Sequence, residues 1–167
     1  AFGFLRMGIT GMTAQEVGKG NVNEAYRLLF RGLIIAFFCS FLLFLSKDFL
    51  LQLALYFIDS DVIVDEKIAN YFNVRILAAP ATLGLYVFIG WFLGKQNALL
   101  AMVITIAVNI FNVFISYYLV SSIGLELSGV AYGTLAAQYL GLAFAFCLFL
   151  MFYRKGLSKD SFNHVTD

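Results

Sequence analysis

Four apolar segments, each long enough to cross a lipid bilayer, constrain this chain more than any other feature of its sequence. The hydrocarbon core of a bilayer is about 30 Å thick and needs roughly 20 mostly apolar residues in a helix. A fifth, partial segment precedes these four. The sequence therefore predicts an all-α fold, a polytopic transmembrane helix bundle. The five segments are Ala1–Ala14, Leu33–Leu45 continued by Phe49–Ile58, Ile68–Leu93, Ala98–Val120 and Val130–Tyr153.

The composition excludes a soluble domain. Of the 167 residues, 62% are hydrophobic and 13% are charged, whereas a soluble domain carries about 25% charged residues. So few polar groups cannot cover a surface that faces water, and lipid must be the outer solvent. The net charge of +1 provides no electrostatic footprint for nucleic acid. We therefore expect the lipid bilayer as a partner and no nucleic acid.

Basic residues divide unequally between the two sides of the predicted bundle. Successive spans alternate in direction, and Lys and Arg concentrate in cytoplasmic loops. We therefore expect the loops 15–23 and 94–97 and the C-terminal tail to be cytoplasmic, in a multi-pass protein of the inner (plasma) membrane. The basic residues on this side are Lys19, Arg27, Arg31, Lys95, Arg154, Lys155 and Lys159, against Lys47 and Lys67 on the other.

Polar breaks with turn chemistry separate the spans. Asn23, in the first break, is predicted to cap a short amphipathic helix that leads into the next span. The breaks 94–97 and 121–129 are short, so they predict antiparallel neighbouring helices. The four breaks are Gln15–Asn23, Asp59–Lys67, Gly94–Asn97 and Ser121–Gly129.

Several single residues within apolar sequence carry further predictions. Pro80, the sole proline, should kink its span and free a carbonyl group. Trp91 and Tyr153 lie near span ends, which is typical of aromatic anchors at the membrane interface. Arg75 is predicted to snorkel to the outer interface, while Arg6 either marks the edge of its segment or lines a cavity.

Polar side chains recur on one face of the span 98–120. Residues 105, 109, 112 and 116 are spaced four, three and four apart, which places them on one side of a helix. Because hydrocarbon offers no water, we expect this face to point into the bundle. The pattern fits hydrogen bonds between helices as well as a cavity wall that binds substrate or ion. The residues are Thr105, Asn109, Asn112 and Ser116.

Small residues repeat at steps of four along the last span, at Gly129, Gly133, Ala137 and Gly141. Such a face lets a second helix approach closely. Thr134 directly follows Gly133, and Gln138 directly follows Ala137. A buried glutamine amide requires hydrogen-bond partners.

The motifs of common enzymes and metal sites are missing from the sequence. Cys39 and Cys147 lie in apolar runs and read as small buried hydrophobes, and His164 is alone in the tail. No HExxH, GxSxG, P-loop or GxGxxG motif is found. We expect neither an enzyme nor a metal or cofactor. No Asp or Glu lies within a span, although an ion relay normally uses one.

Four motifs, taken in order, resemble the multidrug and toxic compound extrusion (MATE) family, in its DinF-like branch. They are FLRMGITGMTAQEVGKGN, WFLGKQN, NIFNVFISYYLV and LSGVAYGTLAAQYLG. The resemblance implies twelve transmembrane helices in two lobes. Residues 1–155 then correspond to helices two to six of the N-terminal lobe, and residues 156–167 to the start of the cytoplasmic linker between the lobes. The first helix and the second lobe would lie outside this chain.

The resemblance also implies site residues. Asn112 takes the family's Asn position on helix five and Thr134 its Thr position on helix six. Ser116 stands where the family often has Asp, so a proton-relay role cannot be transferred to it. The Asp of helix one would lie outside this chain.

The predicted function is export of drugs or other organic cations in exchange for H⁺ or Na⁺, by alternating access. Two alternatives stay open, a flippase for lipid-linked precursors, which would need more basic residues, and a membrane scaffold that transports nothing. The residues predicted to line the cavity are Asn109, Asn112, Ser116, Thr134 and Gln138.

Overall fold

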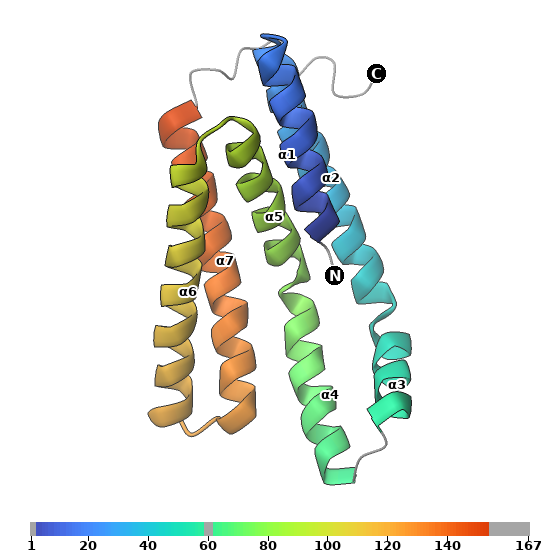
Figure 1. Ribbon diagram of the computed structural model, residues 1–167. Coiled ribbons are helices and arrows are strands. Elements are labelled where there is room, and N and C mark those ends of the chain that lie inside the picture. Colours follow the sequence, from blue (N-terminus) through green and yellow to red (C-terminus); the bar gives the residue numbers. More distant parts are fainter. Residues whose placement is uncertain (1–2, 59–61, 154–167) are drawn as a thin grey trace.

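A computed structural model, which describes residues 3–58 and 62–153, shows a bundle built from α-helices (Figure 1). Two pairs of consecutive helices, α2 with α3 and α4 with α5, run on from each other and are separated by short breaks, while α6 and α7 form an antiparallel hairpin. The predicted all-α class is confirmed. The helices are α1 (Gly3–Gly18), α2 (Val22–Leu45), α3 (Lys47–Ile58), α4 (Val62–Leu77), α5 (Ala79–Gly94), α6 (Ala98–Ser121) and α7 (Glu126–Tyr153).

Four of the predicted spans have the length and apolar character needed to cross a membrane. Helices α2, α6 and α7 meet the requirement individually, and α4 and α5 meet it together, with a bend of 46° between them. The chain is therefore a multi-pass membrane protein. Helix α1 has 16 residues, fewer than the roughly 20 that a full crossing needs, so its crossing stays a prediction.

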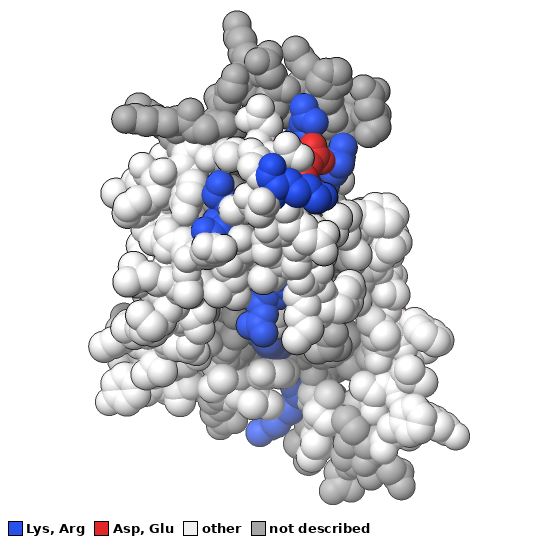
Figure 2. Space-filling view, turned by 45° about the horizontal axis from the view of Figure 1, so that its top comes forward, with Lys and Arg blue, Asp and Glu red and all other residues white. Residues whose placement is uncertain are grey.

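Several charged residues gather at the end of the bundle where α1 meets α2. Figure 2 shows Lys and Arg clustered near the top with acidic atoms among them, and further Lys or Arg atoms in the middle and lower part of the same face. Glu24 pairs with Arg27 at 2.9 Å and with Arg31 at 3.2 Å, and Glu16 pairs with Lys19 at 2.6 Å. These three ion pairs therefore lie at one end of the bundle, near the turn between α1 and α2.

The prediction that Asn23 caps a short separate helix is wrong. Helix α2 begins at Val22 and continues without a break to Leu45, and its N-cap residue is Asn21. The Asn21 side chain donates to the Glu16 carboxylate at 3.1 Å instead of capping α2. Once a helix has begun, each further residue adds a hydrogen bond, so the polar start and the apolar span join into one helix.

Three predicted loops are shorter than expected. In the break Gln15–Asn23, α1 continues to Gly18 and α2 already begins at Val22. Helix α4 already begins at Val62 and includes Asp65, Glu66 and Lys67, and α7 begins at Glu126. Acidic residues are favourable in the first turn of a helix because they face the positive end of its dipole. The charged residues from which we predicted loops therefore lie in the first turns of these helices. Residues 59–61 of the predicted break lie outside the described residues.

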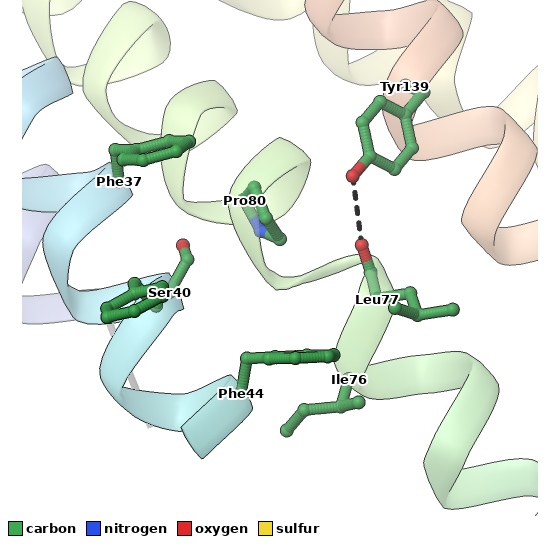
Figure 3. A pocket seen from close by; sticks show the side chains of 8 residues that line it. Phe37, Ser40, Phe44, Ile76, Leu77, Pro80 and Tyr139 are labelled. Atoms are coloured by element: carbon green, nitrogen blue, oxygen red, sulfur yellow. Dashed lines mark hydrogen bonds between the residues drawn. The ribbon is translucent and has the colours of Figure 1, made fainter. Parts of the chain in front are cut away.

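The predicted kink at Pro80 is confirmed. Helix α4 ends at Leu77 and α5 begins at Ala79, with Pro80 in its first turn. Proline lacks an N–H and clashes with the preceding helical turn, so the backbone bends at this point. The Leu77 carbonyl accepts a hydrogen bond from the Tyr139 hydroxyl of α7 at 3.0 Å (Figure 3). This hydrogen bond thus connects the bend between α4 and α5 to α7.

We expect Tyr139→Phe to lower the free energy of unfolding by about 0.6 kcal/mol, the average for a hydrogen bond between membrane helices. The free energy of unfolding is measured by chemical denaturation of the purified protein in detergent. Tyr132→Phe is the matched control, because the exposed Tyr132 lies on the same helix and has no hydrogen bond with a described residue. Equal stability of the two variants would contradict the role given to Tyr139.

Trp91 lies near the end of α5, as predicted, but its side chain is fully buried in the bundle and is not exposed at the membrane interface. Its Nε1 donates to the Ala25 carbonyl at 2.6 Å, so the indole satisfies its only polar group inside the bundle. Its ring packs against Tyr26, Phe149 and Tyr153, with centroids 5.4, 5.5 and 4.9 Å away. This cluster joins α2, α5 and α7 at one end of the bundle.

Lys95, in the turn after α5, lies over three aromatic rings of this cluster. Its Nζ lies 5.4 Å from the ring centre of Tyr26, 5.6 Å from that of Trp91 and 5.8 Å from that of Tyr153. Burial lowers the pKa of Lys95 from its ordinary value. Aromatic faces attract a cation, so the turn 94–97 is held against the helix ends.

Helices α1 and α5 approach so closely that only glycine fits between them. A Cβ atom at Gly90 would lie 2.7 Å from the Arg6 carbonyl oxygen, and one at Gly94 would lie 2.8 Å from the Thr10 carbonyl oxygen. Side-chain-free positions four residues apart allow such backbone contact in membranes. This contact fixes α1 on the bundle.

The two cysteines are less buried than the sequence predicted. Cys39 is half-buried and Cys147 is exposed. An apolar thiol can face lipid at little cost, because acyl chains are as apolar as a protein core. Burial within the bundle is therefore not required for either residue.

Candidate functional site

The α6–α7 hairpin brings together the polar residues that the sequence singled out. Its packing face on α7 is the predicted row of small residues, since Gly133 and Ala137 are buried. A Cβ atom at Gly133 would meet the Ser116 hydroxyl and lie 2.7 Å from the Ser116 Cα atom. The two backbones are therefore in near contact at this level, and the small-residue face is confirmed as a packing surface.

Asn112 of α6 and Thr134 of α7 form a direct hydrogen bond. The Asn112 Nδ2 donates to the Thr134 Oγ1 at 2.9 Å, and the same hydroxyl donates to the Val130 carbonyl at 2.9 Å. Both side chains are half-buried. The Thr134 hydroxyl is thus used as donor and acceptor, while the carbonyl oxygen of Asn112 still offers lone pairs.

Ser116 lies one helical turn from Asn112 and faces Gly133. Its hydroxyl oxygen is buried and has no hydrogen-bond partner among the described residues. Most buried polar atoms in native proteins have a partner. The Ser116 hydroxyl is thus enclosed in the α6–α7 contact with its hydrogen-bonding capacity unused among the described residues.

The other half of the polar stripe does not face α7. Thr105 and Asn109 are exposed, and each bonds to its own helix. The Thr105 hydroxyl donates to the Ala101 carbonyl, and the Asn109 amide donates to the Thr105 carbonyl, both at 2.8 Å. No described helix covers that side of α6, so the prediction that the whole face points into the bundle stays untested at these two positions.

Gln138 lies on α7 four residues after Thr134 and is half-buried. It makes no hydrogen bond with a described residue. The structure thus places Asn112, Ser116 and Thr134 together at the α6–α7 contact, with Gln138 one turn along α7. Asn109 lies apart from them on the exposed side.

The chemistry of this site is neutral. It offers one amide and two hydroxyl groups, and the described residues contain no buried acidic side chain. The described residues also hold no cluster of His, Cys, Asp or Glu that could bind a metal. Neutral oxygens can bind a hard cation as ligands but cannot themselves carry a proton near neutral pH.

Comparison with known proteins decides the family. The family model named MatE matches residues 1–118. The chain belongs to the MatE family. This confirms the resemblance that the four motifs predicted, and membership agrees with the prediction that the chain is not an enzyme. The matched residues of the MatE chain include Asn112 and Ser116, whereas Thr134 and Gln138 follow them.

Two similar proteins place this MatE chain more closely. It is 33% identical over 139 residues to the DNA damage-inducible protein F of Escherichia coli (strain K12), covering 83% of this chain and 30% of that protein. It also matches the inward-facing structure of a multidrug resistance MATE family transporter of the MOP superfamily, with a TM-score of 0.81 and 18% identity, over 90% of this chain and 34% of that one. The chain thus spans about a third of either protein's length.

Proposed function

We propose that this MatE chain is part of a membrane transporter that exports drugs or other organic cations in exchange for H⁺ or Na⁺, by alternating access. The observation that carries this proposal is the Asn112–Thr134 hydrogen bond between α6 and α7. Polar groups within membrane spans are rare and often mark the paths of ions and substrates.

Coupling requires that ion and substrate each bind differently to two states of the protein. A cation bound by the Asn112 carbonyl oxygen and the Ser116 hydroxyl would turn the amide and change its bond with Thr134. The α6–α7 contact would then differ between the ion-bound and ion-free states. Gln138, one turn further along α7, would extend the polar wall toward the substrate.

A site without charged groups leaves two candidates for the coupling ion, Na⁺ and H⁺. Na⁺ can be bound by neutral oxygens alone. H⁺ needs a titratable carboxylate, and that group would have to come from outside the described residues. The described residues could bind Na⁺ directly, whereas coupling to H⁺ would need that outside carboxylate, and a direct transport measurement separates the two ions.

The proposed place of the chain follows the family resemblance. Residues 1–155 would form part of the N-terminal lobe, and residues 156–167 would begin the linker to the second lobe. The turn that holds Lys95 and the charged end at Glu24, Arg27 and Arg31 would face the cytoplasm. The transporter is then the whole protein that carries this chain.

The test is accumulation of ethidium in cells that lack their own efflux pumps. Cells that express the transporter should hold less of this cation than cells with an empty vector. A protonophore should abolish the difference if H⁺ drives export, and removal of Na⁺ should abolish it if Na⁺ does. Equal accumulation, with the transporter found in the membrane, would contradict the proposal and favour a flippase or a scaffold.

A further inference from the structure

Tyr153, the last residue of α7, is held by contacts with three other segments of the bundle. Its carbonyl oxygen accepts a hydrogen bond from the Tyr26 hydroxyl of α2 at 3.2 Å. Its own hydroxyl accepts a hydrogen bond at 3.1 Å from the Nδ2 of Asn97, in the turn before α6. Its ring centre lies 4.9 Å from that of Trp91 on α5 and 5.8 Å from the Lys95 Nζ. The end of α7 is therefore attached to α2, to α5 and to the turn that leads into α6.

The turn 95–97 also fixes the start of α6. The Asn97 Oδ1 accepts a hydrogen bond from the Leu100 N–H at 3.3 Å and so caps α6, while the Nδ2 of the same side chain binds Tyr153. Gln96 has a φ of 61°, a left-handed conformation that is uncommon for residues other than glycine. Such a conformation persists where the surrounding contacts over-determine it. One short turn thus fixes the start of α6 and the end of α7 together.

Lys95 supplies a positive charge at the centre of these contacts. Its Nζ lies within 5.8 Å of the ring centres of Tyr26, Trp91 and Tyr153, which belong to three different helices. The attraction of a cation to aromatic faces out of water is equivalent to about tenfold or more in an equilibrium constant. We call Tyr26, Lys95, Asn97 and Tyr153 the clasp, because together they join the ends of α2, α5, α6 and α7.

The clasp lies at one end of the α6–α7 hairpin, and the candidate site lies toward the other. Figure 1 shows the start of α6 and the end of α7 near the end of α5, with the hairpin turn at the opposite end of the bundle. Asn112 follows Asn97 by 15 residues, which is about 22 Å along α6 at 1.5 Å per residue. A change in the Asn112–Thr134 bond therefore acts on the hairpin far from the clasp.

We propose that the clasp stays closed throughout transport and is the fixed point about which the α6–α7 hairpin moves. This inference rests on the proposed function, because it takes the coupling ion to bind beside Asn112. The bound ion would change the contact between α6 and α7 toward the hairpin turn. The closed clasp would keep both helices attached to α2 and α5 and carry the movement to them. Lys95, Asn97 and Tyr153 are then positioning residues that do not touch the ion.

The first test is hydrogen exchange of the purified transporter in detergent, measured by mass spectrometry. The amides of residues 95–97 and 150–153 should exchange equally slowly with and without Na⁺ or ethidium. Lys95→Met removes the charge but keeps an unbranched side chain, and it should speed exchange in both segments about tenfold. Lys47→Met is the matched control, because Lys47 lies outside the clasp, 5.4 Å from the ring centre of Phe44. Faster wild-type exchange on addition of Na⁺ or ethidium, or unchanged exchange in Lys95→Met, would overturn the proposal.

The second test joins the clasp covalently. Asn97→Cys and Tyr153→Cys are combined in a transporter without its other cysteines, which include Cys39 and Cys147, and a short bifunctional methanethiosulfonate links the two new thiols. Before linking, ethidium turnover in proteoliposomes should be about tenfold slower than in the cysteine-free parent, with an unchanged KM, because the clasp does not touch the candidate site. The link should restore turnover. A link that stops transport by folded protein would show that the clasp must open, which overturns the proposal.

These outcomes separate the clasp from the proposed function. If the cysteine-free parent moves no ethidium, the proposed function fails, and hydrogen exchange of Lys95→Met then decides on the clasp alone. If the double cysteine variant does not fold, ethidium turnover by Lys95→Met replaces it. Normal turnover by Lys95→Met at an unchanged protein level would contradict the role of the clasp.

Discussion

Replacing Gly133 with valine is expected to destabilise the transporter by about 3 kcal/mol, the upper range for overpacking a close-packed site. A Cβ atom there would meet the Ser116 hydroxyl and would lie 2.7 Å from the Cα and 2.8 Å from the N atom of Ser116. Two of these three atoms are backbone, so no side-chain rotation can relieve the clash. Helix α6 would have to move away from α7 and break the Asn112–Thr134 bond.

The measurement is the free energy of unfolding in detergent, together with the amount of protein that reaches the membrane. Gly8→Val is the matched control, because Gly8 is also inside a helix and a Cβ atom there would have no described atom within 4 Å. Valine favours a helix slightly over glycine, so the control should cost less than about 1 kcal/mol. Equal stability of both variants would contradict the near contact of α6 and α7.

Asn112→Ala is expected to reduce efflux about tenfold while the protein still inserts and folds. A hydrogen bond to a charged partner is worth about 1.5–3 kcal/mol, which is tenfold or more in affinity for a bound ion. The folded state would lose only the bond with Thr134, which is worth about 0.6 kcal/mol in a membrane protein. Efflux should therefore fall much more than stability.

Thr134→Val extends this test, since it removes the hydroxyl but keeps the shape. If Asn112 and Thr134 act as one unit, the double variant should export no worse than either single variant. Asn73→Ala, an exposed asparagine on α4, is the control and should export normally. Normal export by Asn112→Ala at an unchanged protein level would contradict the site assignment.

The sequence predicted the helices well where a local pattern determines them. The small-residue repeat on α7 predicted the close α6 contact at Gly133, and Pro80 predicted the bend between α4 and α5. Both outcomes depend on backbone sterics within a few residues. The choice of Asn112 and Thr134 as site residues came from the family motifs, and the structure adds the hydrogen bond between them, because periodicity alone does not say which helix lies opposite.

Features that depend on distant neighbours could not be predicted from local pattern. Trp91 reads as an interfacial residue, but the Ala25 carbonyl of another helix satisfies its N–H inside the core. Asn109 shares a helix face with Asn112, but α7 covers only one side of that face. The spacing of Gly90 and Gly94 was a visible signal for close packing, and the contact with α1 shows its use.

The surroundings of Arg75 depend on long-range packing most of all. Its side chain lies near residues of α2, α3 and α5, whereas the sequence identifies Arg75 only as a cation within an apolar stretch. The position of Tyr139 opposite Leu77 likewise follows from the tertiary fold and not from either segment alone.

The most direct test of the proposed antiport uses the purified transporter in proteoliposomes. A gradient of H⁺ or of Na⁺ would be imposed in separate samples, and ethidium movement would be followed by fluorescence. We predict that one gradient drives ethidium against its own gradient and that Asn112→Ala slows this movement about tenfold. Folded protein that moves no ethidium under either gradient would contradict export of organic cations by this transporter.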